Sequence, residues 1–422
     1  MFSLLSSVIP RFPKMAISRL RRNVPLILFG VAAFCIVGSY ILILRGQQRR
    51  NTELYLNFEK VFFKGPASNF TRGSERVRKN LIIVSHGRSG SSLMGDIFNH
   101  HPSVFYMYEP LQSPERVMKR LRGGNINYTQ MVDHFLSALF RCTFDDPDIL
   151  YDMQRYYRKP DHPRISQAIA SPPLCPYRLT DPKWNPKLCH PMTSKALGTA
   201  CRDHYDLTVI KVLMARIPEN SIKTIFSSCN SKDVDCKVVF LIRDPRAVIT
   251  SSRITGFFKE TGGRTALQGT RNYSYKRCKQ TEENLEYVRR LPDSLRERIK
   301  IQRFEDLAMN PLKELSSLFE FAGLPVLERV KTWLKQTTHS SRAACNHMDG
   351  VDVTCTKDDY WTAINRWRWR AHPGEIDIIE HYCAKVMNLM GYRPVDRSND
   401  LLVNRTFPLF RETFEAKHWF LH

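Results

Sequence analysis

Beyond residue 80 the chain alternates short apolar runs with stretches of helical periodicity. The run from Leu81 to Val84 is continuously apolar, which is typical of a parallel strand buried on both faces. Strands alternating with helices predict an α/β protein, here a P-loop-like three-layer fold with a central, mainly parallel sheet. The predicted strands are residues 81–84, 104–108, 207–210, 238–242 and 299–301, and the predicted helices are residues 93–98, 115–141, 281–291, 311–322 and 374–390.

Two other stretches stand apart from this alternation. Residues 158–203 are rich in Pro and Cys and poor in periodicity, so they predict a long insertion stapled by disulfides. Residues 24–44 hold no charged side chain, and a helix of that length, at about 1.5 Å per residue, spans a bilayer core of about 30 Å. A cleaved signal peptide is the alternative, but the run is too long and lacks a small-x-small cleavage site.

Charge narrows the choice of partner. The chain has 422 residues and a formal net charge of +23, to which residues 1–50 contribute eight basic side chains and no acid. Such a surplus indicates a polyanionic partner: a nucleic acid, an anionic lipid or an acidic glycan. Five Lys or Arg residues precede the membrane run and three follow it, which mildly favours a cytosolic N-terminus.

Cysteines and glycosylation sequons indicate the compartment. Ten of the eleven cysteines follow the membrane run, which predicts disulfides in a lumenal domain, with a pairing that the sequence does not determine. A zinc site is the competing use of these cysteines, but the chain has no Cys-x-x-Cys pair. A lumenal position argues against nucleic acid as a partner. The sequons, all after the run, are Asn69, Asn127, Asn272 and Asn404.

A glycine- and serine-rich turn links the strand at 81–84 to the helix at 93–98. Its backbone N–H groups and the helix N-terminus predict an anion-binding cradle, whereas an ordinary turn is the alternative. The turn lacks the lysine of a Walker A loop, which argues against a P-loop nucleotide kinase. The residues of this predicted site are Gly87, Arg88, Ser89, Gly90, Ser91, Ser92 and Leu93.

A second site follows the strand at 238–242. Arg243 stands at the carboxyl end of that strand, where α/β sheets bind ligands, and Pro245 suits the first turn of a helix. Ser251 lies two turns further and could complete a phosphate clamp with Arg243, although a helix cap with surface charge is the alternative. The residues of this site are Arg243, Asp244, Pro245, Arg246, Ala247, Val248, Ile249, Thr250 and Ser251.

A third segment carries a resemblance to a known family. The stretch at 302–311, Gln-Arg-Phe-Glu-Asp-Leu-Ala-Met-Asn-Pro, together with the two sites above, resembles the sulfotransferases that use 3'-phosphoadenylyl sulfate (PAPS). Residues 87–92 and 105–111 are most similar to the Golgi sulfotransferases of galactose, N-acetylgalactosamine and N-acetylglucosamine 6-hydroxyls. Many members of that group have Thr-Arg where this chain has Gly87-Arg88, and residues after 395 match nothing in it.

The resemblance implies a function and an organisation. It implies transfer of a sulfuryl group from PAPS to a sugar 6-hydroxyl by in-line displacement, without a metal, on an acidic glycan of keratan or chondroitin type. The first site would hold the 5'-phosphosulfate, and Arg243 with Ser251 would hold the 3'-phosphate. We expect a single-pass type II Golgi membrane protein with a lumenal catalytic domain; the oligomeric state stays open. The expected parts are a cytosolic tail (1–23), a signal anchor (24–44), a stem (45–79), the catalytic domain (80–395) and a C-terminal tail of unassigned role (396–422).

The reaction requires a base and positive charge near the leaving phosphate. Arg88 suits the second task. Glu109 is the first candidate base, because it follows a short strand and should emerge at the same sheet edge as the cradle; pairing with a basic neighbour is the alternative. His86 is the second candidate, with a structural hydrogen bond as its alternative.

Two basic features remain open at this stage. Lys211 could contact the donor or an acidic acceptor, or could be a solvated strand terminus. The run from Arg366 to Arg370 could stack on a ligand or simply pack its Trp residues. A membrane-anchored protein that binds acidic glycans without catalysis is the alternative function, which the intact clamp argues against.

Overall fold

The computed structural model describes residues from Val77 to Trp419, with several gaps. The chain divides into units of residues 1–74 and 75–422, and all described residues lie in the second. These are residues 77–121, 127–157, 166–229, 234–261, 267–339, 345–348, 351–355, 360–396, 398–404 and 406–419. The expected cytosolic tail, anchor and most of the stem therefore lie outside the described residues. Among the helices described, none is long and apolar enough to cross a bilayer.

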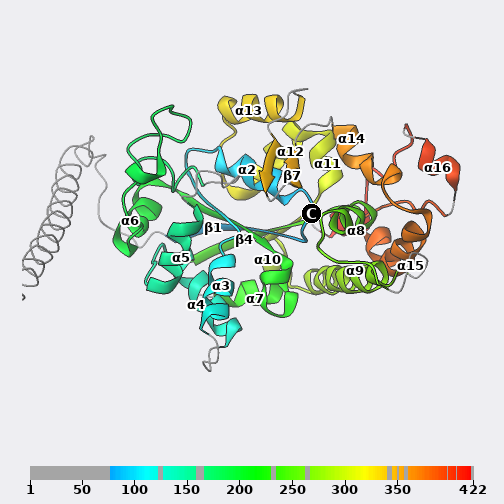
Figure 1. The fold of residues 1–422 in the computed structure, drawn as a ribbon, viewed down its shortest axis with the longest axis horizontal. Coiled ribbons are helices and arrows are strands. Elements are labelled where there is room, and N and C mark those ends of the chain that lie inside the picture. The colour runs from blue at the N-terminus through cyan, green and yellow to red at the C-terminus, as the bar shows by residue number, and fades with distance from the viewer. Residues whose placement is uncertain are drawn as a thin grey trace, which may run out of the picture. The chain divides into compact units, whose positions relative to one another are not determined.

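A five-stranded sheet forms the centre of the domain (Figure 1). Its order is β2-β3-β1-β4-β5 and every neighbouring pair is parallel, so the predicted parallel α/β sheet is confirmed. The central strand is fully buried over its last six residues, which explains its unbroken apolar run. The strands are β1 (Arg78–Ser85), β2 (Val104–Tyr108), β3 (Leu207–Leu213), β4 (Val234–Ile242) and β5 (Ile299–Arg303).

Helices cover both faces of this sheet. Figure 1 shows α2, α12 and α13 on one side and α3, α4 and α7 on the other, as a three-layer fold requires. The helices are α2 (Ser91–Asn99), α3 (Gln112–Arg120), α4 (Tyr128–Phe140), α5 (Pro147–Tyr157), α6 (Ser194–His204), α7 (Ile222–Ser228), α8 (Pro245–Ile254), α9 (Gln268–Arg289), α10 (Asp293–Arg296), α11 (Phe304–Met309), α12 (Pro311–Ala322), α13 (Glu328–His339), α14 (Tyr360–Asn365), α15 (Pro373–Leu389), α16 (Asn399–Val403) and α17 (Glu415–His418).

Short elements complete the fold. The single-turn 3-10 helices are η1 (Pro186–Leu188), η2 (Met214–Arg216), η3 (Pro218–Asn220) and η4 (Arg366–Trp369). The antiparallel strands β6 (Cys345–Met348) and β7 (Val351–Cys355) form a separate ribbon whose register pairs residue 345 with residue 355.

Two helices differ from their predicted extents. The helical pattern at 115–141 is divided between α3 and α4, so one predicted helix is two. The helix predicted at 281–291 begins earlier, at Gln268. The prediction missed its first three turns because they are mostly polar and give little apolar periodicity.

Four disulfides confirm the prediction of an oxidised domain. Cys175–Cys189 closes the Pro-rich insertion, and Cys142–Cys201 joins the end of α4 to α6. Cys229–Cys236 links the end of α7 to β4, and Cys278–Cys383 joins α9 to α15. The last of these closes the largest loop, with a sequence separation of 105 residues, so it constrains the unfolded chain most.

The folded domain continues past the predicted boundary at residue 395. Tyr392 forms a bridge with Phe410, and the rings of Phe410 and Phe414 lie 5.0 and 4.7 Å from the guanidinium of Arg303. The guanidinium is fully buried and also donates to Asp306 and to the carbonyl of Met390. Phe410 and Phe414 are therefore part of the core around β5, because their rings cover a buried charge.

Glu305, at the start of α11, connects β4, β5 and the C-terminal segment. Its carboxylate accepts hydrogen bonds from the Asp244 N–H (3.2 Å) and from the Tyr392 hydroxyl (2.8 Å). Burial, together with the nearby Asp244 carboxylate, raises the pKa of Glu305 to about 7, although Arg243 opposes the shift. The folded protein therefore favours the protonated form of Glu305 more than the unfolded chain does.

We predict a specific pH dependence of stability from Glu305. Its folded pKa lies above its ordinary value of 4.5, so its stabilising contribution is complete below pH 4.5 and is lost as pH rises through about 7. Glu305→Gln should remove this loss, and its unfolding free energy should gain on the wild type, by on the order of 2 kcal/mol, between pH 5 and pH 8. Urea unfolding of both proteins across that range measures the difference; a constant difference would contradict the assignment.

Candidate active site

The glycine- and serine-rich turn after β1 forms a cradle at the carboxyl edge of the sheet. Gly90 adopts a left-handed conformation with φ of 83°, and a Cβ there would lie 2.3 Å from the Phe304 ring, so both backbone and space require glycine. Gly90 is also the N-cap of α2, whose first turn contains no acid. The positive end of the helix dipole thus meets no negative side chain from its own first turn, which favours an anionic ligand.

Arg88, Arg243 and Ser251 meet beside this cradle. Arg88, itself left-handed with φ of 69°, donates from Nε to the Ser251 hydroxyl at 3.0 Å. Arg243 donates from Nη1 to the Arg88 carbonyl at 3.0 Å, and from Nη2 to the carbonyl of Ala363 at 2.7 Å. The structure therefore brings the two predicted phosphate sites together at one point.

Arg243 keeps hydrogen-bonding capacity for a ligand. Its guanidinium lies 4.4 Å from the Phe304 ring, and its buried Nε has no hydrogen-bond partner among the described residues. Burial lowers the pKa of Arg243, with the Glu305 and Asp244 carboxylates opposing that shift. A phosphate beside this group would supply both a partner for Nε and the missing negative charge.

The remaining residues of the second predicted site support the helix and the core. Asp244 caps α8 by accepting from the Arg246 N–H at 2.9 Å. The Arg246 guanidinium is fully buried and pairs with Asp244 and Glu380, both at 2.7 Å, so its side chain faces the interior instead of the cradle. The other buried members of α8 are Pro245, Ala247, Val248, Ile249, Thr250 and Ser252.

The serines of the cradle differ in exposure. Ser89 and Ser91 are buried, whereas Ser92 is half-buried. Leu93 packs against the main hydrophobic core, so its side chain anchors α2. Its contribution to an anion site would be limited to its backbone N–H.

Glu109 lies buried at the end of β2, with φ of 46°. Its carboxylate contacts Lys211 Nζ at 2.5 Å, Arg216 Nη1 at 2.7 Å and Gln112 Nε2 at 2.7 Å. Burial alone would raise the pKa of Glu109, but the two cations outweigh it and hold the pKa at about 2. The group is therefore ionised at neutral pH and intrinsically a weak base.

Lys211 is 2% exposed, so the interpretation as a solvated strand terminus is wrong. Its ammonium lies between the Glu109 carboxylate and the face of the Tyr108 ring, 4.4 Å from the ring centre. The sequence placed Lys211 at a strand end, but β3 continues for two more residues and carries it beside β2.

His86 is buried against α9. Thr281 gives its hydroxyl proton to the Arg277 carbonyl at 2.9 Å, so His86 Nε2, 3.0 Å from the same hydroxyl, must be the donor there. Burial, with Arg277 nearby, lowers the pKa of His86 to about 3, which leaves a neutral ring that binds protons poorly. The structural alternative to a catalytic role accounts for this hydrogen bond.

The aromatic and basic run at 366–370 divides between the interior and the surface. Trp367 is buried beneath the Arg246 guanidinium at 4.4 Å, and Arg368 donates to the carbonyls of Asn404 and Phe407. Trp369 is 46% exposed. The buried half of the run therefore packs, and it holds the C-terminal segment.

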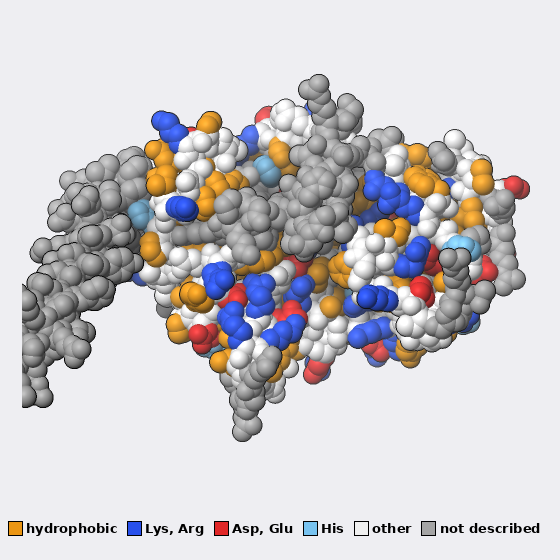
Figure 2. All heavy atoms as spheres, in the orientation of Figure 1, with side chains coloured by type: hydrophobic (Ala, Val, Ile, Leu, Met, Phe, Trp, Pro, Cys, Tyr) orange, Lys and Arg blue, Asp and Glu red, His pale blue; other side chains and the backbone are white. Residues whose placement is uncertain are grey.

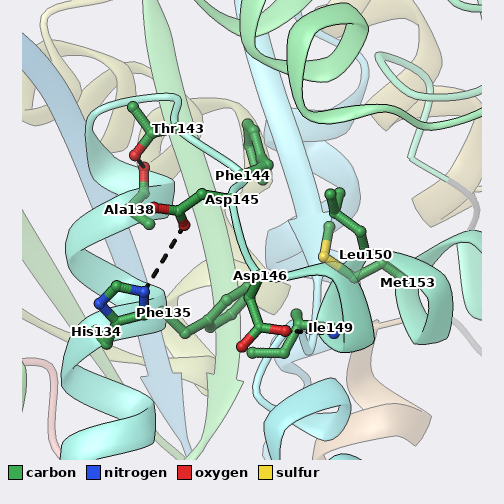
Figure 3. Close-up of a pocket in the computed structure, with 10 residues that line it drawn as sticks. All are labelled: His134, Phe135, Ala138, Thr143, Phe144, Asp145, Asp146, Ile149, Leu150 and Met153. Atoms are coloured by element: carbon green, nitrogen blue, oxygen red, sulfur yellow. Dashed lines mark hydrogen bonds and ion pairs between the residues drawn. The ribbon is translucent and has the colours of Figure 1, made fainter.

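Two hollows among the described residues differ in their relation to the cradle. One, of about 350 Å³ including space open to solvent, adjoins the cradle and is lined by Ser89, Arg243, His86 and Arg277 among others. The other, of about 240 Å³, lies between α4 and α5 (Figure 3). Its polar side chains interact locally, as His134 with Asp145 at 3.7 Å, and no cradle residue lines it. The second hollow is a gap at the edge of the core.

Surface charge near Glu109 is mixed. Figure 2 shows Lys and Arg side chains gathered with acidic ones over α3. Arg116 and Arg120 both pair with Asp152, and Arg216 pairs with Glu115 as well as with Glu109. Within the described ranges, no group of three or more His, Cys, Asp or Glu side chains could hold a metal ion.

The sequons that the structure describes are accessible. Asn127, Asn272 and Asn404 are exposed, whereas Asn69 lies outside the described residues.

Sequence reasoning missed the Ala363 carbonyl and the Phe304 ring, both of which hold Arg243. A backbone carbonyl carries no residue-specific signal, and Phe304 stands 61 positions away in the chain.

Sequence comparisons find relatives that match most of the chain. The chain is 27% identical over 372 residues to human carbohydrate sulfotransferase 6, covering 82% of this chain and 88% of that protein. It is 26% identical over 365 residues to mouse carbohydrate sulfotransferase 3, covering 79% and 72%.

Solved structures with some likeness are the sulfotransferase domain of the Synechococcus PCC 7002 olefin synthase and mouse sulfotransferase SULT7A1 complexed with PAP. The first has a TM-score of 0.37 and 15% identity, covering 75% of this chain and 98% of that one. The second has a TM-score of 0.35 and 11% identity, covering 79% and 89%.

The family model described as "Sulfotransferase domain" matches residues 78–391, from the first residue of β1 to the end of α15 and two residues beyond. The chain therefore belongs to the sulfotransferase domain family.

Proposed function

We propose that the protein transfers a sulfuryl group from PAPS to a sugar hydroxyl of a glycan. The observation that carries this proposal is the meeting of Arg88, Arg243 and Ser251 beside the N-terminus of α2. Two guanidinium groups, a hydroxyl and the N-terminus of α2 suit a donor that carries both a phosphosulfate and a separate phosphate. The carbohydrate sulfotransferases among its relatives support a sugar as the acceptor.

Each part of the donor has a matching group. The cradle from Gly87 to Ser92 would hold the 5'-phosphosulfate, since its turn and helix N-terminus favour anions. Arg243 and Ser251 would hold the 3'-phosphate, with the unpartnered Nε of Arg243 as a donor. Arg88 belongs to the cradle and contacts both Arg243 and Ser251, so it links the proposed 5'-phosphosulfate site to the proposed 3'-phosphate site.

The chemistry is an in-line displacement. The acceptor oxygen forms a bond to sulfur while the bond from sulfur to the bridging phosphate oxygen breaks, and the leaving group departs as PAP. Negative charge grows on that bridging oxygen, where Arg88 and the cradle N–H groups would stabilise it. The hydroxyl proton leaves to a base as the new bond forms.

Glu109 is our candidate for that base. Its low pKa makes it most effective late in the reaction, when the acceptor oxygen has become acidic through bonding to sulfur. The same contacts also suit a second role, in which Glu109 holds the cationic side chains of Lys211 and Arg216 in place by its ion pairs. The two roles differ in their effect on turnover.

We extend the proposal to the acceptor and the compartment. The acceptor is the 6-hydroxyl of galactose, N-acetylgalactosamine or N-acetylglucosamine in an acidic glycan of keratan or chondroitin type. The protein is a single-pass type II Golgi membrane protein with its catalytic domain in the lumen and N-linked glycans at its sequons. The net charge and the resemblance support the acceptor; the four disulfides support an oxidising compartment.

The direct test is transfer itself. We expect the purified protein to move label from sulfur-labelled PAPS onto desulfated keratan or chondroitin, and disaccharide analysis should place the sulfate on a 6-hydroxyl. Glycan binding without any transfer would overturn the catalytic proposal. Transfer to another hydroxyl would overturn the regiochemistry alone.

Arg243→Ala should weaken PAP binding by roughly ten- to a hundredfold, because the 3'-phosphate loses a charge-assisted hydrogen bond. Titration calorimetry measures the affinity. Arg289→Ala, at an exposed position on α9, is the matched control and should bind PAP as the wild type does. An unchanged affinity in Arg243→Ala would contradict the assignment.

Glu109→Gln should lower kcat by about a hundredfold while leaving PAP affinity near normal. The control is Glu115→Gln, which removes the other carboxylate that pairs with Arg216. Because the pKa of Glu109 is about 2, the wild type should show no loss of kcat from this group between pH 7 and pH 5. Wild-type turnover in Glu109→Gln would remove Glu109 from the mechanism.

A further inference from the structure

An exposed aromatic ring lies against the cradle. Phe257 follows the end of α8 and is 52% exposed. A Cβ at Gly87 would lie 3.0 Å from Phe257 Cε1 and 3.4 Å from Cζ, so the ring occupies the space where a side chain at position 87 would stand.

The need for glycine at position 87 is spatial. Among the described glycines, those with positive φ are Gly90, Gly256, Gly323 and Gly391, so the backbone at Gly87 would accept any residue. A larger residue there would instead displace the Phe257 ring. The absence of a side chain at position 87 therefore leaves room for the Phe257 ring.

The backbone around Phe257 is firmly held. The Phe257 N–H donates to the Ser252 carbonyl at 2.9 Å, and the Thr255 hydroxyl donates to the Ser251 carbonyl at 2.8 Å. The next residue, Phe258, stacks on Tyr273 with ring centres 4.4 Å apart. The neighbours of Phe257 are thus fixed by hydrogen bonds and packing, while its own ring stays half in solvent. A ring presented in this way pays little ordering entropy when a ligand covers it.

We propose that Phe257 is a stacking platform for the pyranose ring of the acceptor sugar. The identity of that ligand rests on the proposed function. A pyranose has an apolar face of C–H groups and a polar edge of hydroxyls, so stacking buries the face and leaves the hydroxyls free. Because the Phe257 ring touches the turn that would hold the phosphosulfate, a sugar on this ring would have a hydroxyl beside the transferring group.

The energetic argument favours a ligand at this position. Ile254, 46% exposed, lies three residues before Phe257, and both side chains leave apolar surface in contact with water. Covering such surface is favourable in proportion to the area removed from water. The adenine of the donor is the other flat ring that could stack there, and the two ligands have different kinetic signatures.

The first experiment separates acceptor from donor. Phe257→Ala should raise by roughly tenfold the KM for a keratan or chondroitin oligosaccharide that the wild type sulfates. The PAP affinity and kcat of this variant should stay within about twofold of the wild type. Phe257→Tyr should restore the wild-type KM, because it keeps the ring. Tyr275→Ala, which removes a 58% exposed ring from α9, is the matched control and should leave KM unchanged.

The second experiment tests the contact with Gly87. With PAPS at saturation, so that an effect of position 87 on donor binding does not enter, Gly87→Ala should raise the acceptor KM by pushing the ring away. Under the same condition the acceptor KM of the double variant Gly87→Ala/Phe257→Ala should equal that of Phe257→Ala alone. Additive effects would show that the two positions act separately and would overturn the contact as the cause.

The outcomes are distinct. An unchanged acceptor KM in Phe257→Ala overturns this inference, and a loss of PAP affinity with an unchanged acceptor KM assigns the ring to adenine instead. A wild-type protein that transfers no sulfate to any glycan overturns the proposed function itself, before Phe257 is tested.

Discussion

The position of the Arg243 guanidinium constrains much of the architecture around the candidate site. It is held by two backbone carbonyls, from the cradle and from α14, and by the face of Phe304. These partners are neutral, so they fix the side chain without cancelling its charge. Three separate segments of the chain must therefore arrive at the carboxyl end of β4 before the cation is in place.

The buried arginines nearby show a different arrangement. Arg246 and Arg303 are both fully buried, and each is bonded to carboxylates as well as to a backbone carbonyl. Their charge is balanced inside the protein, and they connect β4 and β5 to α15 and the C-terminal segment. Neighbouring arginines thus divide into the proposed phosphate contact and two that hold the fold, and they differ in the kind of partner.

How far the sequence predicted this arrangement depends on the kind of signal. The parallel strands and the cradle were predictable, because continuous apolar runs and glycine turns are local patterns, and the Arg243–Ser251 spacing follows from helix geometry. The different fates of Arg243 and Arg246 were not predictable, since identical residue types three positions apart are distinguished only by partners from α14 and α15. A basic partner for Glu109 was expected as an alternative, but Lys211 could not be identified as that partner. The register of β2 against β3, which brings the two residues together, is set by the tertiary structure.

The C-terminal segment has a consequence for biosynthesis. A chain is made from its N-terminus, and its strands can begin to pair while synthesis continues. The aromatic cover of Arg303 comes from Phe410 and Phe414, and the Arg246 guanidinium needs Glu380 and the carbonyl of Arg393. The buried charges beside β4 and β5 thus stay uncovered until Phe410 and Phe414 have left the ribosome. The covering of these two arginines therefore waits for the C-terminal segment, and a nascent chain halted before residue 410 would expose the charge of Arg303 that the folded protein buries.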